Sequence, residues 1–162
     1  MFNIESVDIE FSNGRRAIFE RLVGDGEGAV LVVPRPDAES ILLIREYAIG
    51  VERYELGFVK GRIDHGETPE AAAQRELREE IGYGARTLTH LHTVSLTPSY
   101  SNYRTYIYLA DDLFVEAAEG DEPEPLEVVR WPIERLDDLR AAPDFSDARC
   151  HLAICLLKES LS

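Results

Sequence analysis

The sequence predicts an α/β fold of the α+β type, in which an N-terminal antiparallel hairpin precedes a central sheet and helices. Short apolar runs bounded by turn residues recur along the chain, as they do in buried strands. A capped amphipathic helix is indicated near the middle and another near the C-terminus. The length of 162 residues is typical of one domain with a sizeable core.

The N-terminal hairpin is indicated by two strand patterns around a turn. Residues 4–11 alternate apolar and polar side chains, as a half-buried strand does. Asn13-Gly14 signals a type I′ turn, and residues 17–23 supply the returning strand. A glycine-rich connector at 24–28 marks the domain boundary that we expect. The predicted units are a hairpin unit at 1–24, which is a possible dimer arm, and a main domain at 25–162.

Short apolar runs at 29–33 and 41–44 are interpreted as strands of a central sheet. Further strands are expected at 54–59, 88–96, 103–109 and 128–131. An acidic loop with interspersed prolines, EAAEGDEPEP at 116–125, precedes the last strand. A short helix at 133–139 and a helix at about 146–160 follow. The positions expected to be buried in the last helix are Ala148, Leu152, Ile154, Cys155 and Leu156.

The stretch GRIDHGETPEAAAQRELREEIGY, residues 61–83, carries the clearest helix signals. Thr68 is the expected N-cap and Pro69 the first helical residue, while Gly82 or Gly84 ends the helix. The face expected to pack on the sheet consists of Ala71, Ala72, Leu77 and Ile81.

Three glutamates crowd one side of this helix. Glu76 lies three residues before Glu79 and four before Glu80, so the three carboxylates share a face. Like charges this close destabilise an isolated helix by about 0.2–0.5 kcal/mol per pair. Mg²⁺ prefers a few carboxylates together with waters and substrate phosphates. The cluster therefore suggests a cation site, although a solvated charged face would explain the glutamates taken alone.

Composition limits the classes of partner. The formal net charge of −14 argues against a broad surface for nucleic acid or acidic membranes. It does not exclude a small phosphorylated substrate, because bound Mg²⁺ can reverse the local field. Cys150 and Cys155 are interpreted as small buried side chains in a reducing compartment. Without a signal peptide or an apolar run of about 18 residues, we expect a cytoplasmic protein.

The spacing within residues 61–83 resembles the Nudix box of the Nudix hydrolase superfamily. The matching positions are Gly61, Glu67, Arg75, Glu76, Leu77, Glu79, Glu80 and Gly82. The resemblance implies an α/β/α sandwich with a mixed sheet, and Mg²⁺- or Mn²⁺-dependent hydrolysis of a nucleoside diphosphate linked to another moiety. It implies metal ligation by Glu76, Glu79, Glu80 and the backbone carbonyl of Lys60, with a salt bridge between Glu67 and Arg75 that fixes the loop against the helix.

Segments outside the box indicate which group of Nudix hydrolases the chain resembles. Pro98 in SLTPSY is typical of ADP-ribose pyrophosphatases, although it also fits an ordinary turn. Glu122-Pro123-Glu124 looks like the loop that carries the base in these enzymes, with a solvated acidic loop as the alternative. IREYAIGVERYELGFVKG and GDEPEPLEVVRWP resemble the NudE-type family of ADP-compound hydrolases. This implies ADP-ribose, NADH and diadenosine polyphosphates as substrates and AMP as the shared product.

Specific roles follow from the resemblance. Glu79 and Glu124 are catalytic candidates, with Glu124 as general base and Glu122 in reserve. Candidate substrate contacts are Arg45 on the diphosphate, Glu55 on a ribose hydroxyl, the adjacent Glu46 and Arg53, Tyr100 against a base, and Glu20 and Arg21 at the adenine site of a partner subunit. For the strand-end charges the alternative is surface ion pairing, and for Tyr100 it is core packing. A homodimer formed through the hairpin is expected.

Other functions stay open at this point. One alternative is a Nudix hydrolase that acts on nucleoside triphosphates, nucleotide sugars or a capped RNA end. Another is a binding module that retains the scaffold without turnover, which the intact glutamates of the box disfavour.

Overall fold

The computed structural model describes residues 3–24, 27–120 and 123–161. The strands are β1 Asn3–Glu10, β2 Arg16–Val23, β3 Ala29–Pro34, β4 Ser40–Ala48, β5 Arg53–Gly57, β6 Val59–Arg62, β7 Tyr83–Ser95, β8 Arg104–Val115 and β9 Glu127–Pro132. The helices are α1 Pro69–Ile81, α2 Leu136–Ala141 and α3 Ala148–Ser160, with a 3₁₀ turn at Ile133–Arg135 before α2. No helix in these ranges is long and apolar enough to span a membrane.

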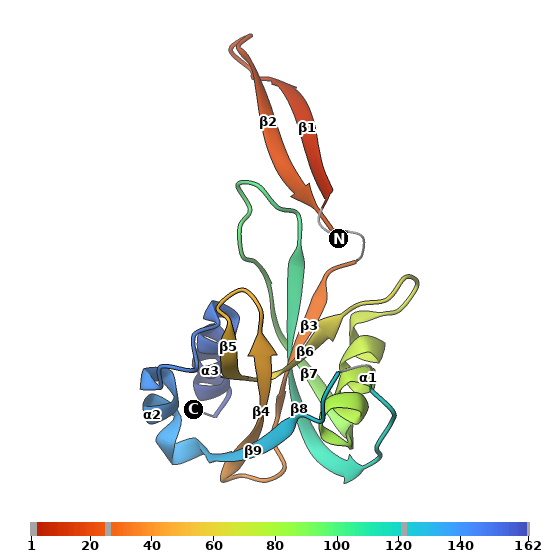
Figure 1. Ribbon diagram of the computed structural model, residues 1–162, viewed down its shortest axis with the longest axis vertical. Helices are drawn as coiled ribbons and strands as arrows, with labels where there is room; N and C mark the ends of the chain where they lie inside the picture. The colour runs from red at the N-terminus through yellow and green to blue at the C-terminus, as the bar shows by residue number, and fades with distance from the viewer. Residues whose placement is uncertain (1–2, 25–26, 121–122, 162) are drawn as a thin grey trace.

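The sheets lie between two layers of helix. One sheet has the order β6-β3-β8-β7 and is mixed, because β3 runs parallel to β8 while its other pairs are antiparallel. The second has the order β5-β4-β9 and is antiparallel. Helix α1 lies on one side of the strands, and α2 and α3 lie on the other (Figure 1). The predicted α/β/α arrangement with a mixed sheet is confirmed, with its strands divided between two sheets.

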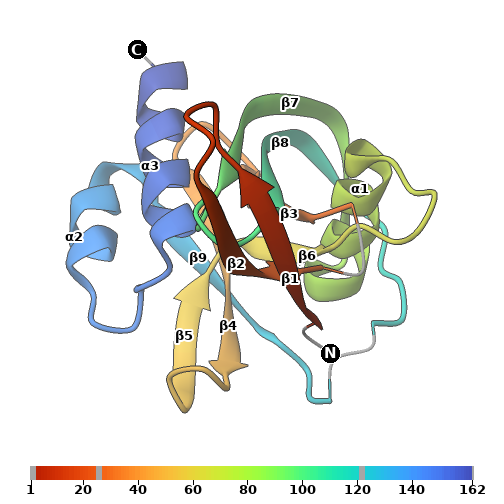
Figure 2. The same ribbon diagram turned by 90° about the horizontal axis from the view of Figure 1, so that it is seen from above.

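The hairpin β1–β2 projects from the body and lies over it when seen from above (Figures 1 and 2). The predicted type I′ turn is wrong. The amide of Gly14 donates to the carbonyl of Phe11 at 2.8 Å, so Ser12 and Asn13 are the central residues of the turn. Gly14 has a φ of 79° and follows the turn as a bulge residue. The Asn13 side chain accepts from the Arg15 amide at 3.1 Å, which stabilises this longer loop.

The loop between β7 and β8 supports the base of the hairpin. The Leu22 amide donates to the carbonyl of Tyr100 at 2.7 Å, and Leu22 forms a parallel bridge with Ser101. The hairpin is therefore tied to the main domain by backbone hydrogen bonding in addition to the connector.

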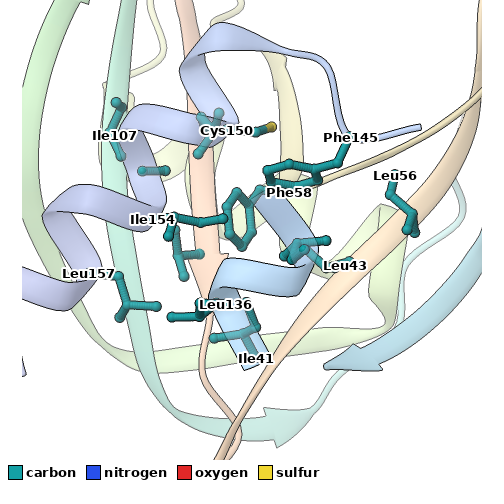
Figure 3. Packing of buried hydrophobic residues seen from close by; sticks show 14 of the residues in the cluster. Ile41, Leu43, Leu56, Phe58, Ile107, Leu136, Phe145, Cys150, Ile154 and Leu157 are labelled. Atoms are coloured by element: carbon teal, nitrogen blue, oxygen red, sulfur yellow. The ribbon is translucent and has the colours of Figure 1, made fainter. Parts of the chain in front are cut away.

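Two buried clusters fill the spaces between the layers. The first lies between the strands and α2 and α3, and Figure 3 shows its members. Phe58 and Phe145 meet there edge to face, with ring centroids 6.2 Å apart. The second lies between the strands and α1 and includes Val30, Leu77 and Ile81. Together the clusters fix both helical layers to the strands.

The predicted strand at 54–59 is wrong as a single element. It divides into β5, which pairs with β4, and β6, which pairs with β3. Phe58, between them, is completely buried in the first cluster, whereas Val59 belongs to the second. The pattern of residues 54–59 indicates a strand but not which strand each half pairs with, so it could not reveal the switch.

The helix ends were predicted well and the buried faces less well. Thr68 caps α1 by accepting from the Ala71 amide, and Gly82 ends it in the left-handed conformation. Ala71 is exposed, contrary to prediction, and the buried residues are Ala72, Ala73, Glu76, Leu77 and Ile81.

The predicted buried face of α3 was also partly wrong. Ala148 is exposed, while Leu152, Cys155 and Leu156 are half-buried. The fully buried residues are Cys150, Ala153, Ile154 and Leu157. Apolar side chains surround much of this helix, so helical periodicity alone does not fix which stripe faces the sheet.

Candidate active site

The site begins where α1 crosses β6. A side chain at Gly61 would place its first carbon only 1.8 Å from Oε1 of Glu76, so the carboxylate occupies the space that any larger residue would fill. Glu76 is only 8% exposed in this position. The glycine therefore allows a carboxylate to lie directly against the backbone of the strand.

Arg75 ties the acidic residues of the site together. Its guanidinium Nη1 donates to Glu76 at 2.6 Å and to Glu79 at 3.0 Å. Its other nitrogens donate to Glu67 at 3.2 and 3.1 Å and to the carbonyl of Arg62 at 2.7 Å. The hydrogen bond to Glu67, followed by the contacts with the two helix glutamates, raises the pKa of Arg75 above its ordinary value. The loop before α1 is thereby held to the helix.

Glu80 occupies the most perturbed environment of the three helix glutamates. Its Oε2 accepts from the backbone amide of Lys60 at 3.3 Å. Burial raises the pKa of Glu80 to about 9, and the nearby Glu76 charge adds to the rise, while the Lys60 ammonium opposes it. Without further positive charge, this carboxyl is therefore protonated at neutral pH.

The residues fit a hard divalent cation. Within the described ranges, no three acidic, histidine or cysteine side chains are already arranged as ligands of one metal ion. Here the carboxylates of Glu76 and Glu79 accept hydrogen bonds from Arg75, and that of Glu80 accepts from the Lys60 amide. Carboxylate and carbonyl oxygens are the donors that Mg²⁺ and Mn²⁺ prefer. A cation would also stabilise the charged form of Glu80, whose pKa is raised mainly by burial. The Gly61 approach leaves room for the Glu76 carboxylate beside the strand.

The side chain of Lys60 faces a separate pocket. Its Nζ donates to Glu46 at 2.7 Å, and both residues line a pocket of about 290 Å³ with Glu55, Ser146, Arg149 and Cys150. The structure thus brings Glu46 and Glu55 together around one pocket, beside the strand that carries Lys60. Sequence reasoning missed the Lys60 side chain, because only its backbone carbonyl was assigned a role.

Three charged candidates for substrate binding on β4 and β5, Arg45, Arg53 and Glu55, already have partners within the protein. Arg45 donates to Asp144 at 2.8 Å and to Glu127 at 3.1 Å. Arg53 donates to Glu55 and to the carbonyl of Pro143. Glu55 also accepts from the amide and the hydroxyl of Ser146, at 3.0 and 2.7 Å. These contacts fix the segment before α3 to the sheet, and substrate roles for the three candidates stay predictions.

The acidic loop connects β8 to β9, and its first residues lie beside the C-terminal end of α1. Arg78 pairs with Glu116, and its carbonyl accepts from the Ala118 amide at 3.1 Å. Further along, Glu124 lines a pocket of about 240 Å³ with Glu79 and Glu80. The fold therefore brings the predicted base to the glutamates of α1. Glu122, the reserve candidate, lies outside the described residues.

Tyr54 is a residue of this region that sequence reasoning missed. Its hydroxyl donates to Oε1 of Glu124 at 2.8 Å. The two residues are 70 positions apart, and no local pattern connects them.

The candidates for an adenine site lie on the hairpin and at its base. Arg21 is paired with Glu5 across the hairpin at 2.6 Å, and Glu20 is exposed opposite Ser6. Tyr100 is 48% exposed in the loop that contacts β2. The hairpin points away from α1 within this chain (Figure 1), so these residues are separate from the carboxylate cluster.

Comparisons with known proteins identify the family. The NUDIX domain family matches residues 27–151, and the NudE-type Nudix hydrolase N-terminal domain matches residues 1–21. The chain belongs to the Nudix hydrolase family.

Its similarity to characterised relatives extends over nearly the whole chain. ADP compounds hydrolase NudE of Escherichia coli is 51% identical over 161 residues, covering 99% of this chain and 86% of the relative. An ADP-ribose pyrophosphatase of Bacillus subtilis is 32% identical, covering 95% of this chain and 84% of the relative. A crystal structure of an ADP compounds hydrolase superposes with a TM-score of 0.91 at 50% identity, covering 99% of this chain and 86% of that structure.

The environment of Glu80 predicts how the metal-free protein responds to pH. The pKa of Glu80 rises from its ordinary 4.5 to about 9 on folding, so between these values the folded chain binds more protons than the unfolded chain. The stability that the protonated Glu80 carboxyl contributes to the folded state is fully present below about pH 4.5 and is lost as pH rises through about 9. Glu80→Gln cannot ionise and should gain stability relative to the wild type as pH increases.

Urea unfolding with a chelator at pH 5.5 and pH 8.5 measures this difference, and the exposed Glu159→Gln serves as the control. The Glu80→Gln protein should be clearly more stable than the wild type at the higher pH. An equal difference at both pH values would contradict the burial of an ionisable Glu80.

Proposed function

We propose that this chain is a metal-dependent pyrophosphohydrolase that cleaves the diphosphate linkage of ADP-containing compounds and releases AMP. The observation that carries the proposal is the cluster of Glu76 and Glu80 against β6, beside the pocket shared by Glu79 and Glu124. The names of its relatives, an ADP compounds hydrolase and an ADP-ribose pyrophosphatase, support the substrate class. ADP-ribose, NADH and diadenosine polyphosphates are the substrates that we propose.

Glu76, Glu79, Glu80 and the carbonyl of Lys60 would hold Mg²⁺ or Mn²⁺. A cation bound there neutralises diphosphate charge and lowers the pKa of a coordinated water. Glu124 accepts the proton of the attacking water as its oxygen forms a bond to phosphorus, with Glu122 as the reserve. The bridging P–O bond breaks, and AMP and the second phosphorylated product leave. Arg75 and Glu67 hold the loop and helix in register throughout.

We propose that the pocket beside Lys60 binds the part of the substrate that is not released as AMP. Its volume of about 290 Å³ lies near the lower limit for small-molecule sites, which suits a sugar more than a larger group. Glu46 and Glu55 supply acceptors for sugar hydroxyls, and the Lys60 ammonium supplies a donor. Arg45 and Arg53, at the neighbouring strand ends, remain candidates for the diphosphate.

We propose a homodimer in which the hairpin contacts a second copy. A two-stranded hairpin alone is marginally stable in water. This one exposes large apolar side chains at Ile4, Ile9, Phe11, Ile18 and Phe19. A partner would bury these groups and would allow Glu20, Arg21 and Tyr100 to reach the adenine site of the other subunit. The boundary at residue 24 and the role of the hairpin as a dimer arm belong to the same proposal.

The proposed setting is the cytoplasm, without nucleic-acid or membrane partners. Cys150 and Cys155 are free, as is usual where thiols stay reduced. The net charge of −14 disfavours polyanionic partners.

A hydrolysis panel tests the activity. ADP-ribose, NADH, diadenosine triphosphate, GDP-mannose and dGTP are compared with Mg²⁺ or Mn²⁺, and incorporation of ¹⁸O from water identifies the phosphorus attacked. We expect AMP from the first three compounds. Preference for dGTP or GDP-mannose would contradict the ADP assignment.

Variants test the metal residues in the same assay. Glu76→Gln and Glu80→Gln should each lower kcat about 100-fold or more, because a ligand is lost, while circular dichroism stays unchanged. Glu159→Gln, an exposed glutamate on α3, should behave like the wild type. Normal turnover of both box variants at saturating Mg²⁺ would exclude the proposed ligand set.

Sedimentation equilibrium tests the dimer. The wild type should have twice the mass of the 18.3 kDa chain, and Ile18→Glu should shift the population toward monomer, because Ile18 is 71% exposed on the hairpin. Arg15→Glu, which also adds a carboxylate to the hairpin but lies exposed in its turn and leaves the apolar side chains intact, is the control. A monomeric wild type would refute the proposal.

A further inference from the structure

The hydrogen bond from Tyr54 to Glu124 connects strands that are not neighbours. Tyr54 lies in β5, while Glu124 lies just before β9, and β4 separates these strands in the order β5-β4-β9. Adjacent strands are about 4.8 Å apart, so the two side chains together span roughly two such spacings. They meet over the intervening strand, with the hydroxyl 2.8 Å from the carboxylate oxygen.

A second tyrosine lies beneath this bridge. Tyr47 in β4 is directly opposite Tyr54 in the register, and the two rings meet edge to face with centroids 5.4 Å apart. Both side chains are about half exposed, at 46% and 47%. The contact restricts the direction in which the Tyr54 ring can lie, and hence the position of its hydroxyl.

The described residues of the loop that carries Glu124 have few other attachments. Before it, the Ala118 amide donates to Arg78, and after it, Glu127 is paired with Arg45. Among the described residues of 119–125, the bond from Tyr54 is the single side-chain hydrogen bond. The position of the Glu124 carboxylate thus depends on Tyr54 more than on any other described side chain.

The charge state of the tyrosine suits this role. The hydrogen bond to Glu124, together with the charge of that carboxylate, raises the pKa of the Tyr54 hydroxyl. The hydroxyl therefore remains a neutral donor at physiological pH.

We infer that Tyr54 is a positioning residue that holds Glu124 toward the glutamates of α1 during hydrolysis. This inference rests on the proposed function, in which Glu124 accepts the proton of the attacking water. General bases typically contribute about 10²- to 10⁴-fold to a rate, and that contribution depends on geometry. Loss of the hydrogen bond from Tyr54 should therefore remove part of the contribution of the base and lower kcat about 10-fold, without changing the groups that bind the substrate.

A double-mutant cycle on hydrolysis of ADP-ribose tests the inference. Tyr54→Phe removes the hydroxyl and keeps the ring, and Glu124→Gln removes the base. We expect Tyr54→Phe to lower kcat about 10-fold at unchanged KM, and Glu124→Gln to lower it further. In the Glu124→Gln background, Tyr54→Phe should cause no additional loss, because its effect passes through the carboxylate.

Tyr47→Phe is the matched control, since it removes a hydroxyl of similar exposure that makes no hydrogen bond within the described ranges. Thermal unfolding of all variants separates a loss of fold from a loss of positioning.

The possible failures are distinguishable. Wild-type kcat for Tyr54→Phe beside an impaired Glu124→Gln would overturn the role of Tyr54 and leave the proposed base intact. An equal loss from Tyr54→Phe in both backgrounds would show that Tyr54 acts independently of Glu124, which also overturns the inference. Full activity of Glu124→Gln would instead remove the base from the proposed function and the positioning role with it.

Discussion

The close contact between Glu76 of α1 and the backbone of β6 at Gly61 is the constraint on which the rest of the site depends. The carboxylate lies where a side chain at residue 61 would be, so the helix can approach the strand this closely only because residue 61 is glycine. Apolar contacts from Leu77 and Ile81 hold the adjoining face of the helix against the sheet. Together they fix the direction in which the carboxylates point.

This contact has an electrostatic cost that the surroundings offset only in part. Arg75 compensates Glu76 and Glu79, and Glu67 in turn orients the guanidinium. Glu80 has the Lys60 amide and a raised pKa instead of a charged partner on the helix. The protein is strongly acidic overall, so little long-range positive charge is available. The divalent cation that we propose would complete the balance, which would connect the stability of the site to its proposed chemistry.

Much of the α1 region could be predicted because its information is local. Helical periodicity grouped Glu76, Glu79 and Glu80, and the cap signals at Thr68 and Gly82 set the ends of the helix. The ion pair between Glu67 and Arg75 followed only from the resemblance to the Nudix box, although the structure contains it.

The remaining features depend on contacts that local patterns do not encode. The division of 54–59 between two sheets reflects a change of pairing partner inside one short segment. The partners of Arg45 come from residues 82 and 99 positions away. The bond from Tyr54 to Glu124 arises because the fold returns the acidic loop beside a sheet formed much earlier in the chain. Such contacts are specified by the folded topology and not by spacing.

Anomalous diffraction from crystals soaked in Mn²⁺ tests directly whether the acidic cluster binds a divalent cation. We expect a peak of anomalous density bounded by the carboxylates of Glu76 and Glu80 and the Lys60 carbonyl, and the loss of that peak in Glu80→Gln. Manganese bound only elsewhere, with Arg75 still holding Glu76 and Glu79 as it does here, would contradict it.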